Sequence, residues 1–227
     1  MLDLDTIHTL KLFIAVLAAY FPTVAFTGYF EAWLAKKFGD DTPEEAGLLT
    51  LNPLAQTRPM GLIMLLLAVL AHFPLISTFG QYIQVDQSKI RAPYAKLKYL
   101  MVLWARAFAS IMLCCASIFM WILFWRLAEV PYEFSKNYPA LMSSIQMLYL
   151  VFRELNIISA VLEFVLGIVR FIMSFLFPNL GEESLFFVMI VEIYLLIACW
   201  YFITPYLHMA VIFVEKIFGY LIAGLIG

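Results

Sequence analysis

Three polar residues in the second half of the chain are spaced so that a helix would carry them along one face. Asn156, Glu163 and Arg170 are each seven positions apart, which is close to two helical turns. The surrounding sequence is apolar, and charges at membrane depth normally face the protein interior or water. Three roles stay open for this stripe: packing between helices, binding of another subunit, or a path for protons or ions. The candidate partners on other apolar segments are Arg106 and Glu192.

The remaining metal-binding side chains lack the spacing of a ligand set. His8, His72 and His208 lie far apart in the sequence. A metal site made from His72, His208 and a carboxylate is an alternative, but interfacial or hydrogen-bonded histidines are the simpler interpretation. The three cysteines lie in apolar runs and are interpreted as packing residues. We therefore expect neither a metal nor another cofactor.

Composition indicates a membrane protein. Of the 227 residues, 64% are apolar and only 13% are charged, whereas a soluble domain has about 45–50% apolar and about 25% charged residues. The formal net charge is −2, and no basic stripe suggests nucleic acid as a partner. We expect one membrane domain spanning residues 1–227, with the lipid bilayer as its surroundings.

Hydropathy divides the chain into about five or six membrane helices. Four segments are long and apolar enough to span a bilayer, and they are 10–34, 100–127, 155–177 and 184–202. Two further segments, 60–79 and 206–226, are less regular, and Pro74 divides the first of them. The expected fold is therefore an all-α polytopic integral membrane protein.

Basic residues favour a common side for two of the loops. Lys36, Lys37 and Arg58 follow the first span, and four more basic residues lie in 80–99. Since such residues prefer the cytoplasm, both loops are predicted on that side, with 60–79 entering and leaving the membrane as a hairpin. A full span that breaks the charge rule is the alternative.

The segment from Thr27 to Gly61 carries a recognisable pattern. It contains Phe38-Gly39-Asp40, Thr42-Pro43, Ala46-Gly47, the run Leu49-Thr50-Leu51-Asn52-Pro53-Leu54-Ala55, Pro59 and Gly61. This pattern resembles the signature region of the site-2 protease family, intramembrane zinc metalloproteases, in its short bacterial branch. The resemblance is weaker after about residue 115. It implies a site-2-protease-like transmembrane core, with a short irregular or β-like excursion near 47–60 and 80–90, and a bacterial inner membrane.

The chain departs from the family pattern at the positions of the zinc ligands and the general base. The motif H-E-x-x-H places two histidine ligands on one helix face with a glutamate as general base. At the matching positions this chain has Thr27, Gly28 and Glu31, and Phe171 aligns with the aspartate that supplies the third ligand, give or take two residues. Gln56-Thr57-Arg58 replaces a further family run. Catalytic zinc usually needs three protein ligands, so the resemblance implies a degenerate member with no catalytic residues.

These observations predict a pseudoprotease. We expect a catalytically inactive, site-2-protease-like protein with a scaffolding or regulatory role, which binds other integral membrane proteins as a subunit of a larger complex. The alternatives are a transport or channel component using Glu163 and Arg170, and an active metalloprotease with displaced ligands. We expect a closed, mostly apolar contact between residues 24–31 and 160–173. The Thr27 hydroxyl is expected to bond to the helix, Gly28 to admit a close neighbour, and Glu31 to turn toward the loop or the cytoplasmic boundary.

Overall fold

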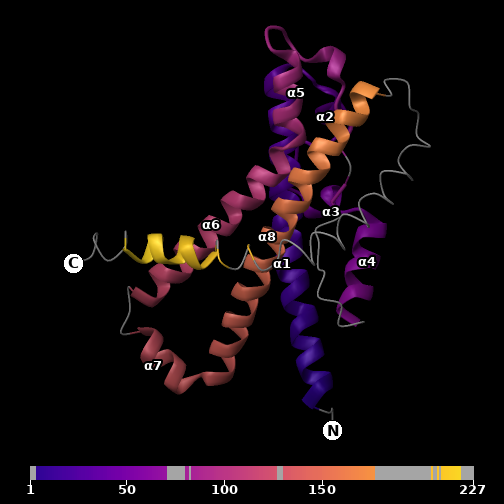
Figure 1. Cartoon of the computed structure of the whole chain (residues 1–227). Coiled ribbons are helices and arrows are strands. Elements are labelled where there is room, and N and C mark those ends of the chain that lie inside the picture. The colour runs from indigo at the N-terminus through magenta and orange to yellow at the C-terminus, as the bar shows by residue number, and fades with distance from the viewer. Residues whose placement is uncertain are drawn as a thin grey trace.

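The structure is a computed structural model that describes residues 4–70, 80–81, 83–126, 130–176, 206, 209 and 211–220. This part of the chain is mostly helical (Figure 1). The helices are α1 (Leu4–Phe38), α2 (Thr42–Glu45), α3 (Pro53–Gln56), α4 (Pro59–Leu70), α5 (Ala95–Leu103), α6 (Ala105–Arg126), α7 (Val130–Asn137) and α8 (Pro139–Leu176), with a 3-10 turn at Gln87–Lys89. Residues 211–220 are also helical.

Three of these helices are long and apolar enough to cross a membrane. The candidate spans are Ile7–Phe38 in α1, Ala105–Trp125 in α6 and Pro139–Phe175 in α8. The prediction of a helical fold with segments able to span a membrane is thereby confirmed for the described residues, and the expected five or six spans stay a prediction. The expected span at 184–202, with Glu192, lies outside the described residues, as do all of 71–79 and parts of 206–226.

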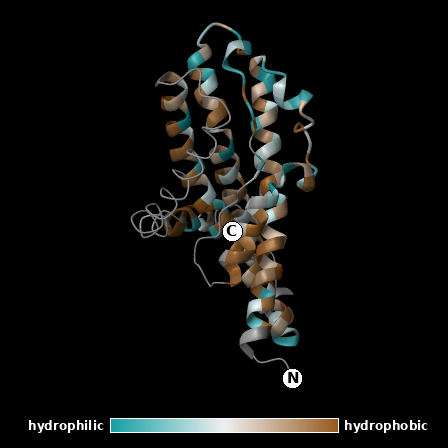
Figure 2. Ribbon diagram, turned by 90° about the vertical axis from the view of Figure 1, so that its right-hand side faces the viewer, coloured by the Kyte–Doolittle hydropathy of each residue, from teal (hydrophilic) through white to brown (hydrophobic). Residues whose placement is uncertain are grey.

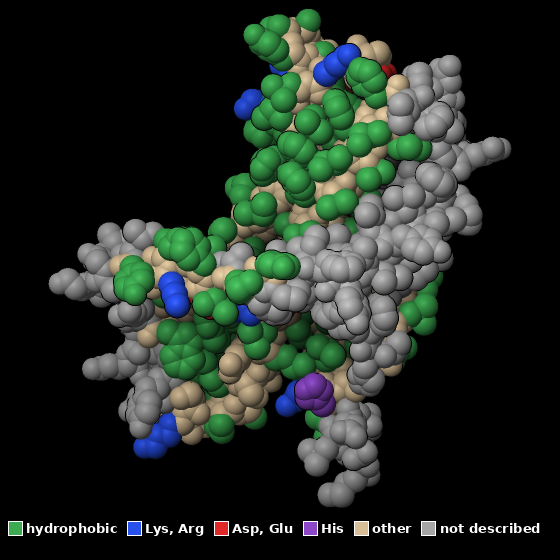
Figure 3. Space-filling model, in the orientation of Figure 1, with side chains coloured by type: hydrophobic (Ala, Val, Ile, Leu, Met, Phe, Trp, Pro, Cys, Tyr) green, Lys and Arg blue, Asp and Glu red, His purple; other side chains and the backbone are tan. Residues whose placement is uncertain are grey.

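Hydropathy is distributed as a membrane setting requires. Apolar residues run along the long helices, and hydrophilic residues gather in the connections at one end of the molecule and near the N-terminus (Figure 2). Hydrophobic side chains cover most of the visible surface over α5, α6 and α8 (Figure 3). Such a surface is stable where lipid or protein, rather than water, contacts it.

The core is built where α4 and α8 pack on α1. One buried cluster joins Val16, Tyr20 and Val24 of α1 to Leu65 and Val69 of α4. The α4 residues are four positions apart, so they form one helix face. The opposite face of α4 is exposed, which leaves this helix at the edge of the bundle.

The expected excursion between α1 and α5 is irregular, with no β-strand among the described residues. Its nearest approach to a strand is one isolated antiparallel bridge between Thr57 and Gly80, accompanied by a hydrogen bond from Gln81 N to Gln56 O of 2.7 Å. The chain therefore leaves the neighbourhood of Thr57 after Arg58 and returns to it at Gly80. The predicted hairpin at 60–79 requires such a return.

The two basic loops lie side by side. The buried carboxylate of Asp40 accepts hydrogen bonds from Thr42 N at 3.0 Å and from Asp86 N at 2.8 Å. Lys89 Nζ donates to Thr42 Oγ1 at 3.0 Å. Hydrogen bonds from the Ser88 side chain and backbone also lower the pKa of the Asp86 carboxyl. Loops 35–59 and 80–99 therefore share one end of the molecule, and the assignment of that end to the cytoplasm stays a prediction.

Candidate functional site: a buried charge cluster between three helices

Arg106 is the centre of a buried polar cluster. It lies in the first turn of α6, directly after the break between α5 and α6, and is 5% exposed. Its Nε donates to Glu31 Oε2 of α1, and its Nη2 donates to the backbone oxygen of Gln81. Its Nη1 lies 4.0 Å from Glu163 Oε1 of α8. One guanidinium therefore connects α1, α8 and the returning loop.

The cluster is electrically balanced. Arg170, two turns further along α8, places Nη1 at 3.7 Å from Glu163 Oε2. Two arginines thus face two glutamates, Glu31 and Glu163, and all four side chains are largely buried. Burying a charge is costly unless it is paired. The neutral set can therefore persist where an isolated ion could not.

The spacing-based prediction of the stripe is confirmed for two of its three members. Glu163 and Arg170 contact each other, and Arg106 is the partner of Glu163 as expected. Asn156 instead packs toward α1, where its Nδ2 donates to Thr23 Oγ1 at 3.1 Å and to Phe152 O at 2.8 Å. The stripe therefore divides into a charged part and a separate amide contact between α1 and α8.

Gln56 fills the space beside Gly28. A Cβ atom built on Gly28 would meet Gln56 Oε1 at 2.0 Å, so only glycine permits this approach. The amide is fixed by donation from Nε2 to Leu48 O at 2.5 Å and to Thr50 O at 3.3 Å. The expectation that Gly28 admits a close neighbour is confirmed.

Thr27 also behaves as its sequence context predicts. Its hydroxyl donates to Thr23 O, one turn back in α1, at 2.9 Å. This local bond uses the one proton of the hydroxyl inside a buried helix face. Thr27 is therefore a packing residue of α1 that satisfies its own polar group.

The expected position of Glu31 is wrong. The sequence predicts a closed, mostly apolar contact between 24–31 and 160–173, with Glu31 turned toward the loop or the cytoplasmic boundary. Glu31 is instead 2% exposed and paired with Arg106. The reason is that the break before α6 brings a guanidinium next to the carboxylate, so Glu31 gains an ionic partner without reaching water.

Phe171 belongs to a different neighbourhood. It packs with Ile90, Tyr99 and Leu103, and its ring centroid lies 6.4 Å from that of Tyr99. This contact holds α5 against the end of α8. The aligned position of the third family ligand therefore carries an apolar contact.

The residues at these positions do not fit a zinc ion. Thr27 is committed to a backbone carbonyl, Gly28 has no side chain, and Glu31 is held by a guanidinium. A metal between Glu31 and Glu163 would have to displace the positive charge of Arg106. In the described ranges, no group of three His, Cys, Asp or Glu side chains converges in the way a metal site requires.

Sequence reasoning missed the roles of Gln56 and Gln81. Gln56 lies in a run whose departure from the family pattern was visible, but its contact with Gly28 depends on the fold of the loop. Gln81 contributes a backbone oxygen, which no side-chain pattern reveals. Gly167 of α8 also allows a close approach, since a Cβ there would meet Trp104 Cδ1 at 2.4 Å.

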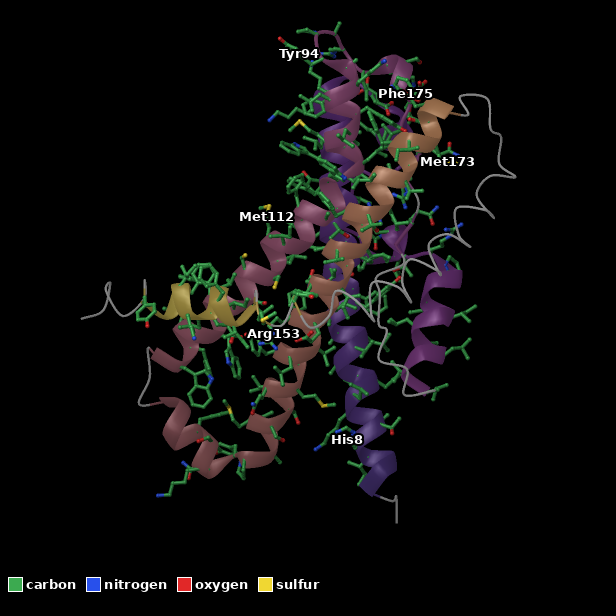
Figure 4. All side chains as sticks on the ribbon, in the orientation of Figure 1. His8, Tyr94, Met112, Arg153, Met173 and Phe175 are labelled. Carbon is green, nitrogen blue, oxygen red and sulfur yellow. The ribbon has the colours of Figure 1, made fainter. Side chains whose placement is uncertain are left out.

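A second polar contact lies toward the other end of α8. Arg153 Nη1 is 2.6 Å from Glu215 Oε1, and the Tyr149 hydroxyl is 3.3 Å from the same oxygen. Figure 4 shows Arg153 on α8 beside the helical segment 211–220. Val211 of that segment packs with Cys114, Ile118 and Ile157. The segment is thus fixed to α8 by one ion pair and to both α6 and α8 by apolar contacts.

Comparison with known proteins gives no relative. No family model matches the chain, and neither a curated protein nor a solved structure matches it. The fold and the charge cluster define a helical membrane protein with a buried, ion-paired centre.

Proposed function

We propose that this protein is a catalytically inactive, multi-pass relative of the site-2 proteases, which acts as a structural or regulatory subunit of a membrane complex. What carries the proposal is the position of Arg106. Its guanidinium is bound to Glu31, the position at which the resemblance would put the second zinc ligand. A fixed cation paired with Glu31 stabilises the helices but has no open coordination position at which to activate water.

The remaining frame supports a binding role. The signature run after α1 keeps its turn residues, including the Asn52 cap that accepts from Leu54 N at 3.0 Å. The exposed surface of α6 and α8 is apolar (Figure 3). Partner helices associate with such surfaces through van der Waals packing. The proposed location is a bacterial inner membrane, and the proposed partners are other integral membrane proteins.

Co-purification from membranes in a mild detergent tests this function. The expected result is a discrete complex that contains this chain and at least one other integral membrane protein in fixed ratio. Proteolysis of a transmembrane substrate that a chelator abolishes would contradict the proposal and favour the displaced-ligand protease. A matched Glu31→Gln variant, assayed beside the wild type, shows whether any cleavage depends on this site.

A transport or channel component is the second candidate, because Glu163 is the less tightly held carboxylate. Its Oε2 accepts no hydrogen bond within the described part of the chain, although Arg170 is nearby. Flux across proteoliposomes that Glu163→Gln abolishes and Glu154→Gln preserves would favour this candidate over the scaffold. Glu154 is a suitable control because it is a half-exposed glutamate on the same helix.

A further inference from the structure

A polar cavity lies between the two loops at the end of α1. It has a volume of about 310 Å³ and is lined by Thr42, Pro43, Ala46, Leu48, Arg58, Gln81 and Gln84. The polar side chains on its wall are the Thr42 hydroxyl, the Arg58 guanidinium and the Gln81 and Gln84 amides. Each of these groups can donate hydrogen bonds. The cavity is therefore suited to an anion.

Arg58 is the positive charge of this cavity. In the described residues it has no carboxylate within ion-pair distance. Two of the neighbouring acidic side chains have cationic partners of their own, since Glu44 pairs with Lys36 at 2.6 Å and Glu45 lies 3.9 Å from Lys89. The guanidinium is thus left for a ligand, and it can bind a phosphate group in the bidentate manner that favours arginine.

Helix α4, which begins next to the cavity, indicates what kind of molecule carries that phosphate. Arg58 directly precedes α4, and Figure 1 shows α4 extending from α3 toward the N-terminal end of the molecule. On α4, Leu65 and Val69 pack on α1, whereas Ile63, Leu67 and Leu70 are at least half exposed. These three residues form one apolar stripe that begins just over one turn after Arg58.

We propose that this site binds an anionic phospholipid, with its phosphate in the Arg58 cavity and an acyl chain along the Ile63–Leu67–Leu70 stripe. A polar cavity whose arginine has no ion pair among the described residues, followed by an exposed apolar helix face, matches the polar and apolar halves of one lipid molecule. A soluble phosphate ion would use the cavity but would gain nothing from the stripe.

Native mass spectrometry of the detergent-solubilised protein with added phosphatidylglycerol or phosphatidylcholine tests the proposal. The wild type should retain one phosphatidylglycerol in preference to phosphatidylcholine. Arg58→Gln should lower this retention about fivefold, since one basic side chain is removed from the anionic headgroup. Arg91→Gln is the matched control, an exposed arginine in the same loop region but outside the cavity, and it should retain the lipid as the wild type does.

A second pair of measurements separates the headgroup from the chain. Leu67→Gln leaves the cavity intact and should also weaken retention, whereas millimolar inorganic phosphate should not displace the bound lipid. Equal retention by wild type and Arg58→Gln, equal binding of both lipids, or displacement by inorganic phosphate would each overturn the proposal. Unfolding temperatures of the variants close to that of the wild type establish that the losses are not caused by misfolding.

Discussion

Arg106 is the residue on which the packing of the three long helices depends most. Its guanidinium contacts Glu31, Glu163 and the backbone of Gln81 at once. Replacing it with leucine leaves two carboxylates buried with Arg170 as the only remaining cation of the cluster. Removing one partner of a buried ion pair destabilises a protein by about 3–5 kcal/mol.

We therefore expect Arg106→Leu to lower the free energy of unfolding by about 3–5 kcal/mol, as measured by denaturant titration in detergent. Glu44→Gln is the control, because it breaks the exposed pair with Lys36 and should cost about 0–1 kcal/mol. The double variant Glu31→Gln, Arg106→Gln should be less destabilised than the sum of its single variants. Equal effects of Arg106→Leu and Glu44→Gln would show that the buried cluster contributes no more than a surface pair.

Gly28 provides a separate test of packing at single-residue level. An alanine there would push against Gln56 Oε1, and overpacking of this kind costs about 1–3 kcal/mol. Thermal unfolding should show a lower midpoint for Gly28→Ala, and Gln56→Ala in the same chain should recover most of the loss. Gly219→Ala, where no atom lies within 4 Å of the new Cβ, should leave the midpoint unchanged or slightly raised. A Gly28→Ala protein as stable as the wild type would mean that Gln56 does not occupy this space.

The helices show which parts of the fold a sequence can specify. The long helices could be predicted because their apolar composition is a local property, although the span expected at 155–177 is the second part of the longer helix Pro139–Leu176. The α5–α6 break at Trp104 has no proline or glycine to mark it, so 100–127 was read as one continuous span. The break between α5 and α6 sets the direction in which the Arg106 side chain points. The pairing of Arg106 with Glu31 therefore could not be predicted, whereas the pairing of Arg106 with Glu163 could.

The loop elements give a prediction about membrane topology. Because Asp40 and Thr42 bond to Asp86 and Lys89 across the two loops, residues 47 and 89 must face the same compartment. In a chain whose native cysteines are replaced, Gly47→Cys and Lys89→Cys should react with an impermeant maleimide from the same side of sealed vesicles, and that side should be cytoplasmic. Labelling from opposite sides would contradict the hairpin.

At the scale of the whole molecule, a buried set of charges connects the three long helices α1, α6 and α8. Restoring the family motif should therefore harm the protein. The triple variant Thr27→His, Gly28→Glu, Glu31→His removes the partner of Arg106 and inserts a side chain into the space of Gln56. We expect it to be less stable than the wild type, to bind no stoichiometric zinc by elemental analysis, and to cleave no transmembrane substrate. Zinc-dependent cleavage by this variant would show that the site had been preserved and its activity only recently lost.

The pairing of Glu31 with Arg106 also has a consequence for biogenesis. The two residues are 75 positions apart, and a ribosome adds about 5–20 residues per second, so the carboxylate is made about 4–15 s before its cation. During that interval α1 carries an unmatched acid into the insertion machinery. Glu31 lies within two turns of the end of α1, close enough to the aqueous boundary to stay hydrated. We therefore expect the centre to form in the order of synthesis, with Glu31 of α1 first, Arg106 of α6 next, and Glu163 and Arg170 of α8 last.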